Sequence, residues 1–217
     1  MGTITTAFPT SFKQELAQGM HCFSAPQTVT VTLNSNNNLT SMATQANLCR
    51  GMGLSAGGNI PASCFLVDLP TGTTGTIFPA ATGSGSTSVT FNGDTFNVAL
   101  IVASPTGNYG AATALYSALG ADEVSGTGYT AGGQALATNI TPQTSGTTAF
   151  WSWSVNPSWT SATFSTGGCE FYNASTRAST GRVVYVGSFG GTQTVTAGTF
   201  TLVLPTNNSS NAILRIQ

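Results

Sequence analysis

Residues 182–205 read RVVYVGSFGGTQTVTAGTFTLVLP, in which β-branched and aromatic residues form short runs separated by glycine. The runs are RVVYVGSF (182–189), TQTV (192–195) and TFTLVLP (199–205). Short runs of this kind, bounded by turn residues, are typical of β-strands. Similar runs lie on both sides, at TTAFWSWSV (147–155), SATF (161–164), CEFYN (169–173) and AILRI (212–216). Short strands at close spacing predict an all-β fold, and we expect a β-sandwich of the Ig-like or jelly-roll kind.

The chain carries very little charge. Charged residues form 5% of its 217 residues, and the formal net charge is -1. An ordinary soluble domain has about 25% charged residues, so solubility here must depend on hydroxyl and amide groups. Hydrophobic residues form 40% of the chain, which argues against disorder. The basic residues are too dispersed for a phosphate-binding surface, so we expect no nucleic-acid partner. They are Lys13, Arg50, Arg177, Arg182 and Arg215.

The N-terminal segment gives the best helix signal. An arm at residues 3–8 alternates apolar and hydroxyl residues and could pair as a strand. Ser11, with Gln14 three residues on, resembles a capping box. Phe12, Leu16 and Met20 or Ala17 then form an apolar stripe, and Gly19 marks the expected end of the helix. No apolar run is long enough to span a bilayer, and the start lacks the features of a signal peptide, so we expect no membrane partner.

The middle of the chain divides the sequence into three expected parts. TVTVTL (28–33), SVTF (88–91) and DTFNVALIV (94–102) predict strands, whereas residues 34–87 are rich in Gly, Asn and Thr and predict long loops with one short strand at 63–68. We therefore expect an N-terminal arm and helix (1–23), a loop-rich insertion (24–93) and a core β-sandwich (94–217). Within the last part, residues 111–119 could form one or two helical turns, and 123–131 predict a β-hairpin around Gly126-Thr127-Gly128.

The four cysteines, Cys22, Cys49, Cys64 and Cys169, are widely spaced. The absence of a C-x-x-C pair disfavours zinc, and we expect neither a metal nor a cofactor. Buried, reduced thiols are the favoured state for most of them. If one disulfide forms, Cys49 with Cys64 is the best candidate, because both lie in a Gly-rich stretch that a tether would stabilise.

No catalytic motif is present, and we expect a protein that is not an enzyme. The only histidine, His21, lacks a nucleophile motif and is expected to be a satisfied surface or interface residue. Asp122 and Glu123 favour a solvated turn or a charged strand edge; a pair of either with Glu170 would be needed for polysaccharide hydrolysis. Trp151 and Trp153 are expected on one face of a strand, and with Trp159 they indicate core packing or, alternatively, a sugar or subunit contact.

Several segments resemble a family of small virion structural proteins of tailed bacteriophages. They are FPTSFKQELAQGMHCF (8–23), DTFNVALIVAS (94–104), EVSGTGYTAGG (123–133), SATFSTGGCEFYN (161–173), VVYVGSFGGTQTVTAGTFTLVLP (183–205) and NAILRI (211–216). The block at 24–93 departs from this family, whose members pass almost directly from the helix to the first core strand. The resemblance implies a virion protein, assembled in the bacterial host cytoplasm, whose partners are other phage structural proteins.

Two roles on the particle follow from these expectations. The first is a capsid decoration or cement protein that forms homo-oligomers and binds the major capsid protein through apolar and strand-edge contacts. The alternative is a tail, neck or fibre-associated module in which residues 24–93 recognise the host surface. For either role we expect Phe8, Phe12 and Leu16 to contact a neighbouring subunit.

Overall fold

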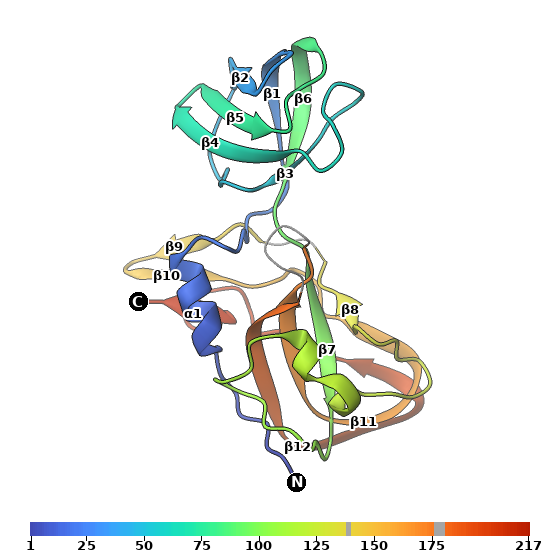
Figure 1. Ribbon diagram of the computed structural model, residues 1–217. Coiled ribbons are helices and arrows are strands. Elements are labelled where there is room, and N and C mark those ends of the chain that lie inside the picture. Colours follow the sequence, from blue (N-terminus) through green and yellow to red (C-terminus); the bar gives the residue numbers. More distant parts are fainter. Residues whose placement is uncertain (138–139, 176–180) are drawn as a thin grey trace. The chain divides into compact units, whose positions relative to one another are not determined.

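The computed structural model describes residues 1–137, 140–175 and 181–217, and their fold is mostly β with one short N-terminal helix (Figure 1). The chain forms two compact units. We call residues 1–21, 95–137 and 153–206 the sheet unit, and residues 22–94, 138–152 and 207–217 the barrel unit. The strands form one closed six-stranded barrel and two open antiparallel sheets. The predicted β class and short helix are confirmed, but the architecture is not plainly a sandwich.

The sheet unit is built on four antiparallel strands in the order β12-β11-β7-β8. Two of these strands are much longer than the sequence runs predict. The runs at 161–164 and 169–173 join in one strand, and the runs from 182 onward join in another, because β-bulges absorb the irregular residues between them. The bounds are β7 (Phe96–Val102), β8 (Gln134–Ala135), β11 (Ser158–Asn173) and β12 (Arg182–Thr201).

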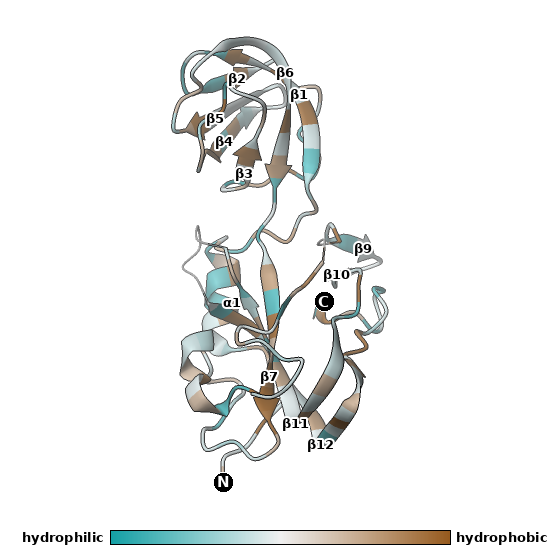
Figure 2. Cartoon of the chain, turned by 90° about the vertical axis from the view of Figure 1, so that its right-hand side faces the viewer, coloured by the Kyte–Doolittle hydropathy of each residue, from teal (hydrophilic) through white to brown (hydrophobic). Residues whose placement is uncertain are grey.

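Hydrophobic residues of β7 anchor this sheet (Figure 2), and most of that strand is buried. On one face, Ala99 and Ile101 of β7 pack with Tyr172 of β11 and with two valines of β12. The loop that follows β7 covers this face with Tyr109 and Leu119. A sheet face buried in this way fixes the register of its strands, because a slip of one residue would turn the apolar set to solvent.

The N-terminal arm adds to the edge of this sheet. Ala7 and Val186 of β12 exchange two backbone hydrogen bonds, of 3.0 and 2.9 Å, so the arm meets the sheet through an isolated bridge and not as the strand that its alternation suggests. Helix α1 follows at Thr10–Ala17, and Gly19 comes just after it with a φ of 66°. Gly19 tolerates this left-handed conformation because it has no Cβ atom.

The predicted capping box of Ser11 and Gln14 is wrong. Pro9 holds the N-cap position, and no side chain caps the helix. Proline fixes the backbone for entry into a helix, so α1 can begin without a side-chain acceptor. The hydroxyl of Ser11 is instead buried without a hydrogen-bond partner.

The loop between β7 and β8 contains two 3-10 helices, η1 (Tyr116–Ala118) and η2 (Gly120–Asp122). The helical turns expected at 111–119 therefore appear only in part. The hairpin predicted at 123–131 is wrong, because Thr127 forms an isolated bridge with Thr163 of β11 instead. Gly128 has a φ of 78°, and a Cβ atom there would lie 2.7 Å from the carbonyl oxygen of Thr160. These glycines let the loop lie flat against the strand.

The barrel unit corrects the expectation of a loop-rich insertion. Its strands close in the order β1-β2-β5-β4-β3-β6, with β6 paired to β1 over eight residue pairs from Gln27↔Phe91 to Asn34↔Ser84. Hydroxyl and glycine residues that suggest loops in the sequence are exposed on these strands, as at Ser84, Gly85 and Ser86 of β6. The bounds are β1 (Gln27–Asn34), β2 (Asn38–Thr40), β3 (Gly53–Ser55), β4 (Phe65–Thr71), β5 (Thr74–Phe78) and β6 (Ser84–Asn92).

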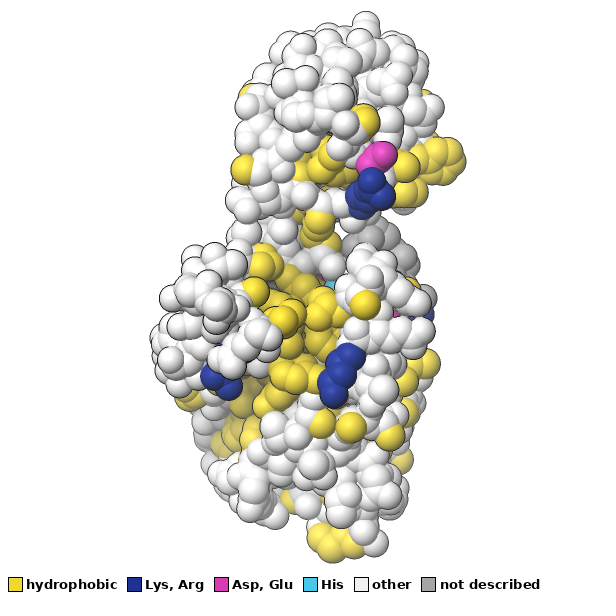
Figure 3. Space-filling view, turned by 90° about the vertical axis from the view of Figure 1, so that its left-hand side faces the viewer, with side chains coloured by type: hydrophobic (Ala, Val, Ile, Leu, Met, Phe, Trp, Pro, Cys, Tyr) yellow, Lys and Arg dark blue, Asp and Glu magenta, His cyan; other side chains and the backbone are white. Residues whose placement is uncertain are grey.

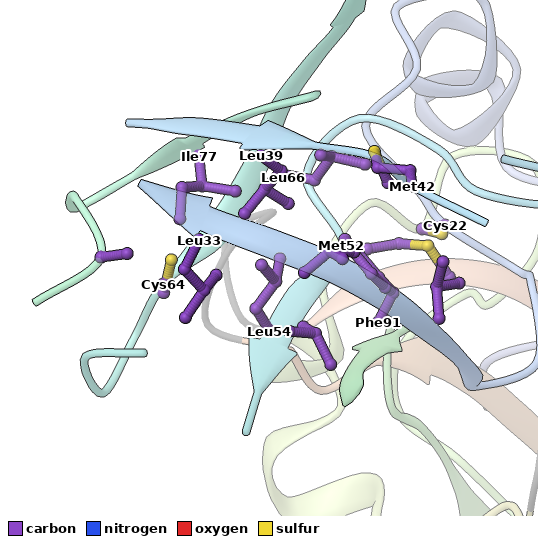
Figure 4. Packing of buried hydrophobic residues seen from close by; sticks show 14 residues of the cluster. Cys22, Leu33, Leu39, Met42, Met52, Leu54, Cys64, Leu66, Ile77 and Phe91 are labelled. Carbon is purple, nitrogen blue, oxygen red and sulfur yellow. The ribbon is translucent and has the colours of Figure 1, made fainter. Parts of the chain in front are cut away.

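Apolar side chains from all six strands or their loops fill the barrel. Figure 4 shows Leu33, Leu39, Leu66 and Ile77 pointing toward one another, and each is at most 1% exposed. Burial of a side chain of this kind contributes about 1.5–3 kcal/mol. Because every strand has neighbours on both sides, the barrel has a core of its own.

One disulfide ties the barrel, and it differs from the predicted candidate. It joins Cys22 to Cys49, whose Cα atoms are 6.7 Å apart, whereas Cys64 and Cys169 are free and buried. Cys64 is not available for a disulfide with Cys49, because it lies in the core, where its thiol donates to the carbonyl oxygen of Pro79. The chain enters and leaves the barrel at one place: the amide of Cys22 donates to the carboxylate of Asp94, and the amide of Asp94 donates to the Cys22 carbonyl, each at 2.8 Å.

The second open sheet also belongs to the barrel unit. Its order is β13-β10-β9, formed by β9 (Gln143–Ser145), β10 (Thr148–Trp151) and β13 (Leu214–Ile216). Trp151 ends β10 and packs against Phe23 with tilted rings, at a ring-centroid distance of 4.3 Å. Trp153 lies beyond the strand and belongs to the sheet unit, so the prediction that both tryptophans share one strand face is wrong.

Candidate functional site

The acidic residues of the sheet unit are structural, and they are not solvated as expected from the sequence. Asp122 is buried at the end of η2, where its carboxylate accepts hydrogen bonds from Gly107 N (2.7 Å), Thr106 N (2.9 Å) and the Tyr109 hydroxyl (2.8 Å). Burial alone would raise the pKa of Asp122, but these hydrogen bonds outweigh burial and lower the pKa to about 2. Asp122 therefore stays ionised and anchors the loop after β7.

Glu123, the next residue, binds a second set of groups. Its carboxylate accepts hydrogen bonds from the hydroxyls of Tyr116 (2.6 Å) and Tyr129 (2.8 Å) and from the amide of Gly132 (2.7 Å). The pKa of Tyr129 is raised, first by burial and then by the charge of Glu123. Asp122 and Glu123, which are adjacent in the sequence, thus hold the two ends of the loop between β7 and β8 against the sheet.

Glu170 has a different environment. It lies near the C-terminal end of β11 opposite Ala99 of β7 and Val186 of β12, is 0% exposed, and neither carboxyl oxygen has a hydrogen-bond partner. Burial, and then the charge of Glu123, raise the pKa of Glu170 to about 8. A carboxyl group in this state is protonated at neutral pH, and a substrate cannot reach it because it is fully buried.

A third network joins the N-terminal helix to the sheet. Glu15 of α1 accepts from His21 Nε2 (2.8 Å) and from Arg182 Nη1 of β12 (2.5 Å). His21 Nδ1 accepts from the side-chain amide of Asn173 at 3.0 Å. The histidine is satisfied, as expected, but it is buried rather than on the surface. Its role is to hold α1 on the sheet.

The tryptophans are all buried, with exposures of 2 to 6%, which agrees with the core interpretation. Trp159 of β11 packs with Tyr129, Phe164 and Phe200, at ring-centroid distances of 5.9 to 6.5 Å. This aromatic cluster supports the outer half of the hairpin formed by β11 and β12. Aromatic pairs at such distances add about 0.5–1.5 kcal/mol each.

The outer half of β12 is the best candidate for an interaction site. Up to Ser188, the outer edge of β12 is covered by the arm and by the loop at 114–115: Ser188 N donates to the Thr6 hydroxyl, and Val183 N to the Ala114 carbonyl. From Gly190 to Thr201, β11 is the only pairing partner of β12 among the described residues. We call residues 190–201 the β12 edge.

The β12 edge lacks two of the usual protections of an exposed strand, charge and proline, although register shifts interrupt its pairing with β11 in this stretch. Natural proteins cover such edges or place lysine or proline on them to prevent pairing with other chains. Most residues from 190 to 201 are exposed, and none of them is charged or proline. Serine and threonine hydroxyls bond across the hairpin, as between Ser165 and Thr194 at 2.8 Å. The edge is therefore open to a further strand.

The sequence contains a signal for this site. Between Arg182 and Arg215 the chain has no charged residue, so a long strand in this interval must present an uncharged surface. The runs in this interval predict several short strands, however, so the length of the open edge becomes visible only in the structure.

The predicted contact residues of the N-terminus lie on the sheet unit. Phe12 is 2% exposed and packs against His21, with ring centroids 5.4 Å apart. Phe8 packs 5.3 Å from the ring of Tyr185 and is half-buried, as is Leu16. Contact with a neighbouring subunit stays a prediction, and Phe8 and Leu16 are the residues with surface left to make it.

One hollow of about 410 Å³ lies over the loop after β7. Its lining is mostly backbone and small side chains, such as Ala112, Thr113 and Ala118. Tyr109 is the only titratable group among the described residues that line it, and its hydroxyl is bonded to Asp122. This hollow brings no reactive groups together.

In residues 1–137, 140–175 and 181–217, no three His, Cys, Asp or Glu side chains gather as potential metal ligands. The same part of the chain contains no helix with the length and hydrophobicity to cross a bilayer. Comparison with known protein families, curated proteins and solved structures finds no match for this chain.

Proposed function

We propose that this protein is a structural component of a phage particle, most simply a capsid decoration or cement protein, and that the β12 edge binds a strand of a neighbouring particle subunit. The observation that carries the proposal is the open, uncharged edge at residues 190–201. Strand addition to such an edge uses backbone hydrogen bonds for affinity, and neighbouring side chains supply specificity.

The low charge of the chain supports this role. Many copies of a protein with a formal net charge of -1 can pack closely with little mutual repulsion. The acidic residues of the sheet unit stabilise its fold or are buried in it. Asp122 and Glu123 hold the loop after β7, and Glu15 holds α1. Glu170 is fully buried. The hydrogen bonds of Asp122, Glu123 and Glu15 make the sheet unit a stable support for the edge.

Lysines on the β12 edge provide the test. Thr192 and Thr196 are exposed, so T192K with T196K should leave the fold intact and block strand addition. We expect purified particles carrying this variant to lose most of the protein on a quantitative gel. The matched control is S88K, which places lysine at an exposed position of β6 inside the closed barrel and should leave occupancy unchanged. Full occupancy with T192K/T196K would contradict the proposal.

The same gel separates decoration from the alternative role. Copy number relative to the major capsid protein is high, in the hundreds, for a decoration protein and a small multiple of three or six for a tail, neck or fibre module. A small number would favour the second role, in which the barrel unit is presented to the host surface.

A further inference from the structure

The barrel displays a small group of exposed apolar side chains on its outer wall. Phe78 of β5 is 58% exposed and Val67 of β4 is 43% exposed, and among the described residues of 22–94 these are the large hydrophobic side chains that face solvent. Phe65 of β4 lies opposite Phe78, with ring centroids 6.0 Å apart. The three side chains come from one hairpin.

An ion pair borders these three residues. Arg50 Nη2 lies 2.6 Å from Asp68 Oδ1, and the two side chains are 75% and 41% exposed. Figure 3 shows an acidic and a basic side chain in contact on the barrel, with yellow apolar atoms close by. Arg50 and Asp68 are the barrel's exposed charges, because Asp94, the other charged residue of 22–94, is buried. We call Phe65, Val67, Phe78, Arg50 and Asp68 the barrel patch.

The barrel is closed, so it cannot bind a partner by adding a strand, and the patch must act through side chains. An apolar centre with an exposed arginine beside it has the composition of a protein interface. The patch carries one positive and one negative charge and no other, so its charge pattern is complementary to itself. A two-fold axis that buries Phe78 against its copy can place each Arg50 opposite the other copy's Asp68.

We propose that the barrel patch binds the barrel patch of a second copy of this chain. The apolar area is small: Phe78 exposes on the order of 100 Å², whereas a stable interface buries about 800 Å² on each partner. The contact is therefore weak between free protomers. It becomes effective where many copies are held side by side, because the local concentration is then high. It is independent of the β12 edge, which lies in the other unit.

Charge reversal in trans tests this contact. All proteins carry T192K/T196K, so that pairing through the β12 edge does not contribute, and association is measured by sedimentation velocity up to millimolar concentration. We expect the reference protein to form a weak dimer. R50E alone and D68R alone should each dimerise at least about tenfold more weakly, because each variant opposes like charges across the two-fold axis.

An equimolar mixture of R50E and D68R should then associate as the reference protein does. In the mixed dimer, position 50 of each copy faces position 68 of the other copy, and both of these contacts join opposite charges. Loss of the ion pair within one chain cannot produce this rescue, because the mixture restores no intramolecular pair. V67D is a further variant, and it should abolish association in every combination without changing the melting temperature.

Three results would overturn the proposal: a reference protein that stays monomeric at millimolar concentration, single variants that associate as well as the reference, or a mixture without rescue. A monomeric reference would leave the patch to a different partner, such as another particle protein or a host surface. Because the edge is blocked throughout, none of these results bears on occupancy through the β12 edge, which the particle experiment measures separately.

Discussion

The carboxyl groups of Glu123 and Glu170 interact although one is bonded to two tyrosine hydroxyls and the other has no hydrogen-bond partner. The charge of Glu123 adds to the effect of burial and raises the pKa of Glu170 to about 8. From the sequence, this pair is only a candidate for catalysis. In the structure it is a buried acid beside a fixed charge, and it makes the stability of the sheet unit depend on pH.

We predict that the free energy of unfolding falls as the pH rises from about 4.5 to 8. In this window the unfolded chain releases the proton of Glu170, whose ordinary pKa is 4.5, while the folded chain keeps it. The folded state therefore loses up to about 1.4 kcal/mol per pH unit, and the loss levels off above pH 8. Urea unfolding across this range measures it. In Glu170→Gln this dependence of the free energy of unfolding on pH should largely disappear. If it is unchanged, another titratable group causes it.

Tyr109→Phe should destabilise the sheet unit by about 1.5–3 kcal/mol, because it removes a hydrogen bond to the ionised carboxylate of Asp122. The control is Tyr185→Phe, since no described group bonds the hydroxyl of Tyr185. Chemical unfolding monitored by tryptophan fluorescence compares the two. Equal effects would show that the Tyr109 hydroxyl contributes only its burial. Because the pKa of Asp122 is lowered to about 2, its contribution should also decline as the pH falls below 3.8 toward 2.

Cys22→Ser should lower the free energy of unfolding of the barrel unit by about 3–4 kcal/mol, the value expected for a cross-link of this loop length. The residues it joins are 27 apart in sequence. Cys49→Ser should have a similar effect, and the double variant should be no worse than either single one. A reductant should destabilise the wild type and leave all three variants unchanged. Additive effects of the single substitutions would contradict the bond.

The N-terminal contact can be tested without disturbing the core. Phe12→Ala should cost about 3–5 kcal/mol of stability in the isolated protein, because Phe12 is buried in its own chain. Leu16→Lys changes a half-buried position of α1 and should leave the melting temperature within a few degrees. If α1 touches a neighbour, Leu16→Lys lowers particle occupancy. Unchanged occupancy would remove Leu16 from the proposed interface.

The strand content of the C-terminal half could be predicted from the sequence because its β-branched and aromatic runs are closely spaced and bounded by turn residues. The runs at 28–33 and 88–91 also predict β1 and part of β6. Closure of the barrel could not be predicted, because β2 and β3 are only three residues long and lie in a stretch rich in serine, threonine, asparagine and glycine, the residues that also mark loops. Gly75 illustrates the difficulty: as a glycine it suggests a turn, but it lies within β5, at a position where a Cβ atom would approach the sulfur of Met42 to 3.2 Å. The residues around Gly75 in the sequence do not indicate this contact with Met42.

The acids of the candidate site illustrate a second limit. Asp122 and Glu123 stand among glycines and read as a solvated turn, but their partners come from residues 6 to 16 positions away along the chain. These hydrogen bonds depend on how the loop after β7 folds back on the sheet, and the periodicity of the sequence does not indicate that. The pairing of Cys22 with Cys49 is similar, because it follows from closure of the barrel.

The two hydrogen bonds between Cys22 and Asp94 have a consequence for how this chain can change over time. Because residues 22–94 begin and end at the same point, a segment of about this length could be gained, lost or exchanged without cutting through the strands that precede and follow it. The join between Cys22 and Asp94 is thus a natural graft point, at which a different small domain could replace the barrel while β7 and its neighbours keep their pairing.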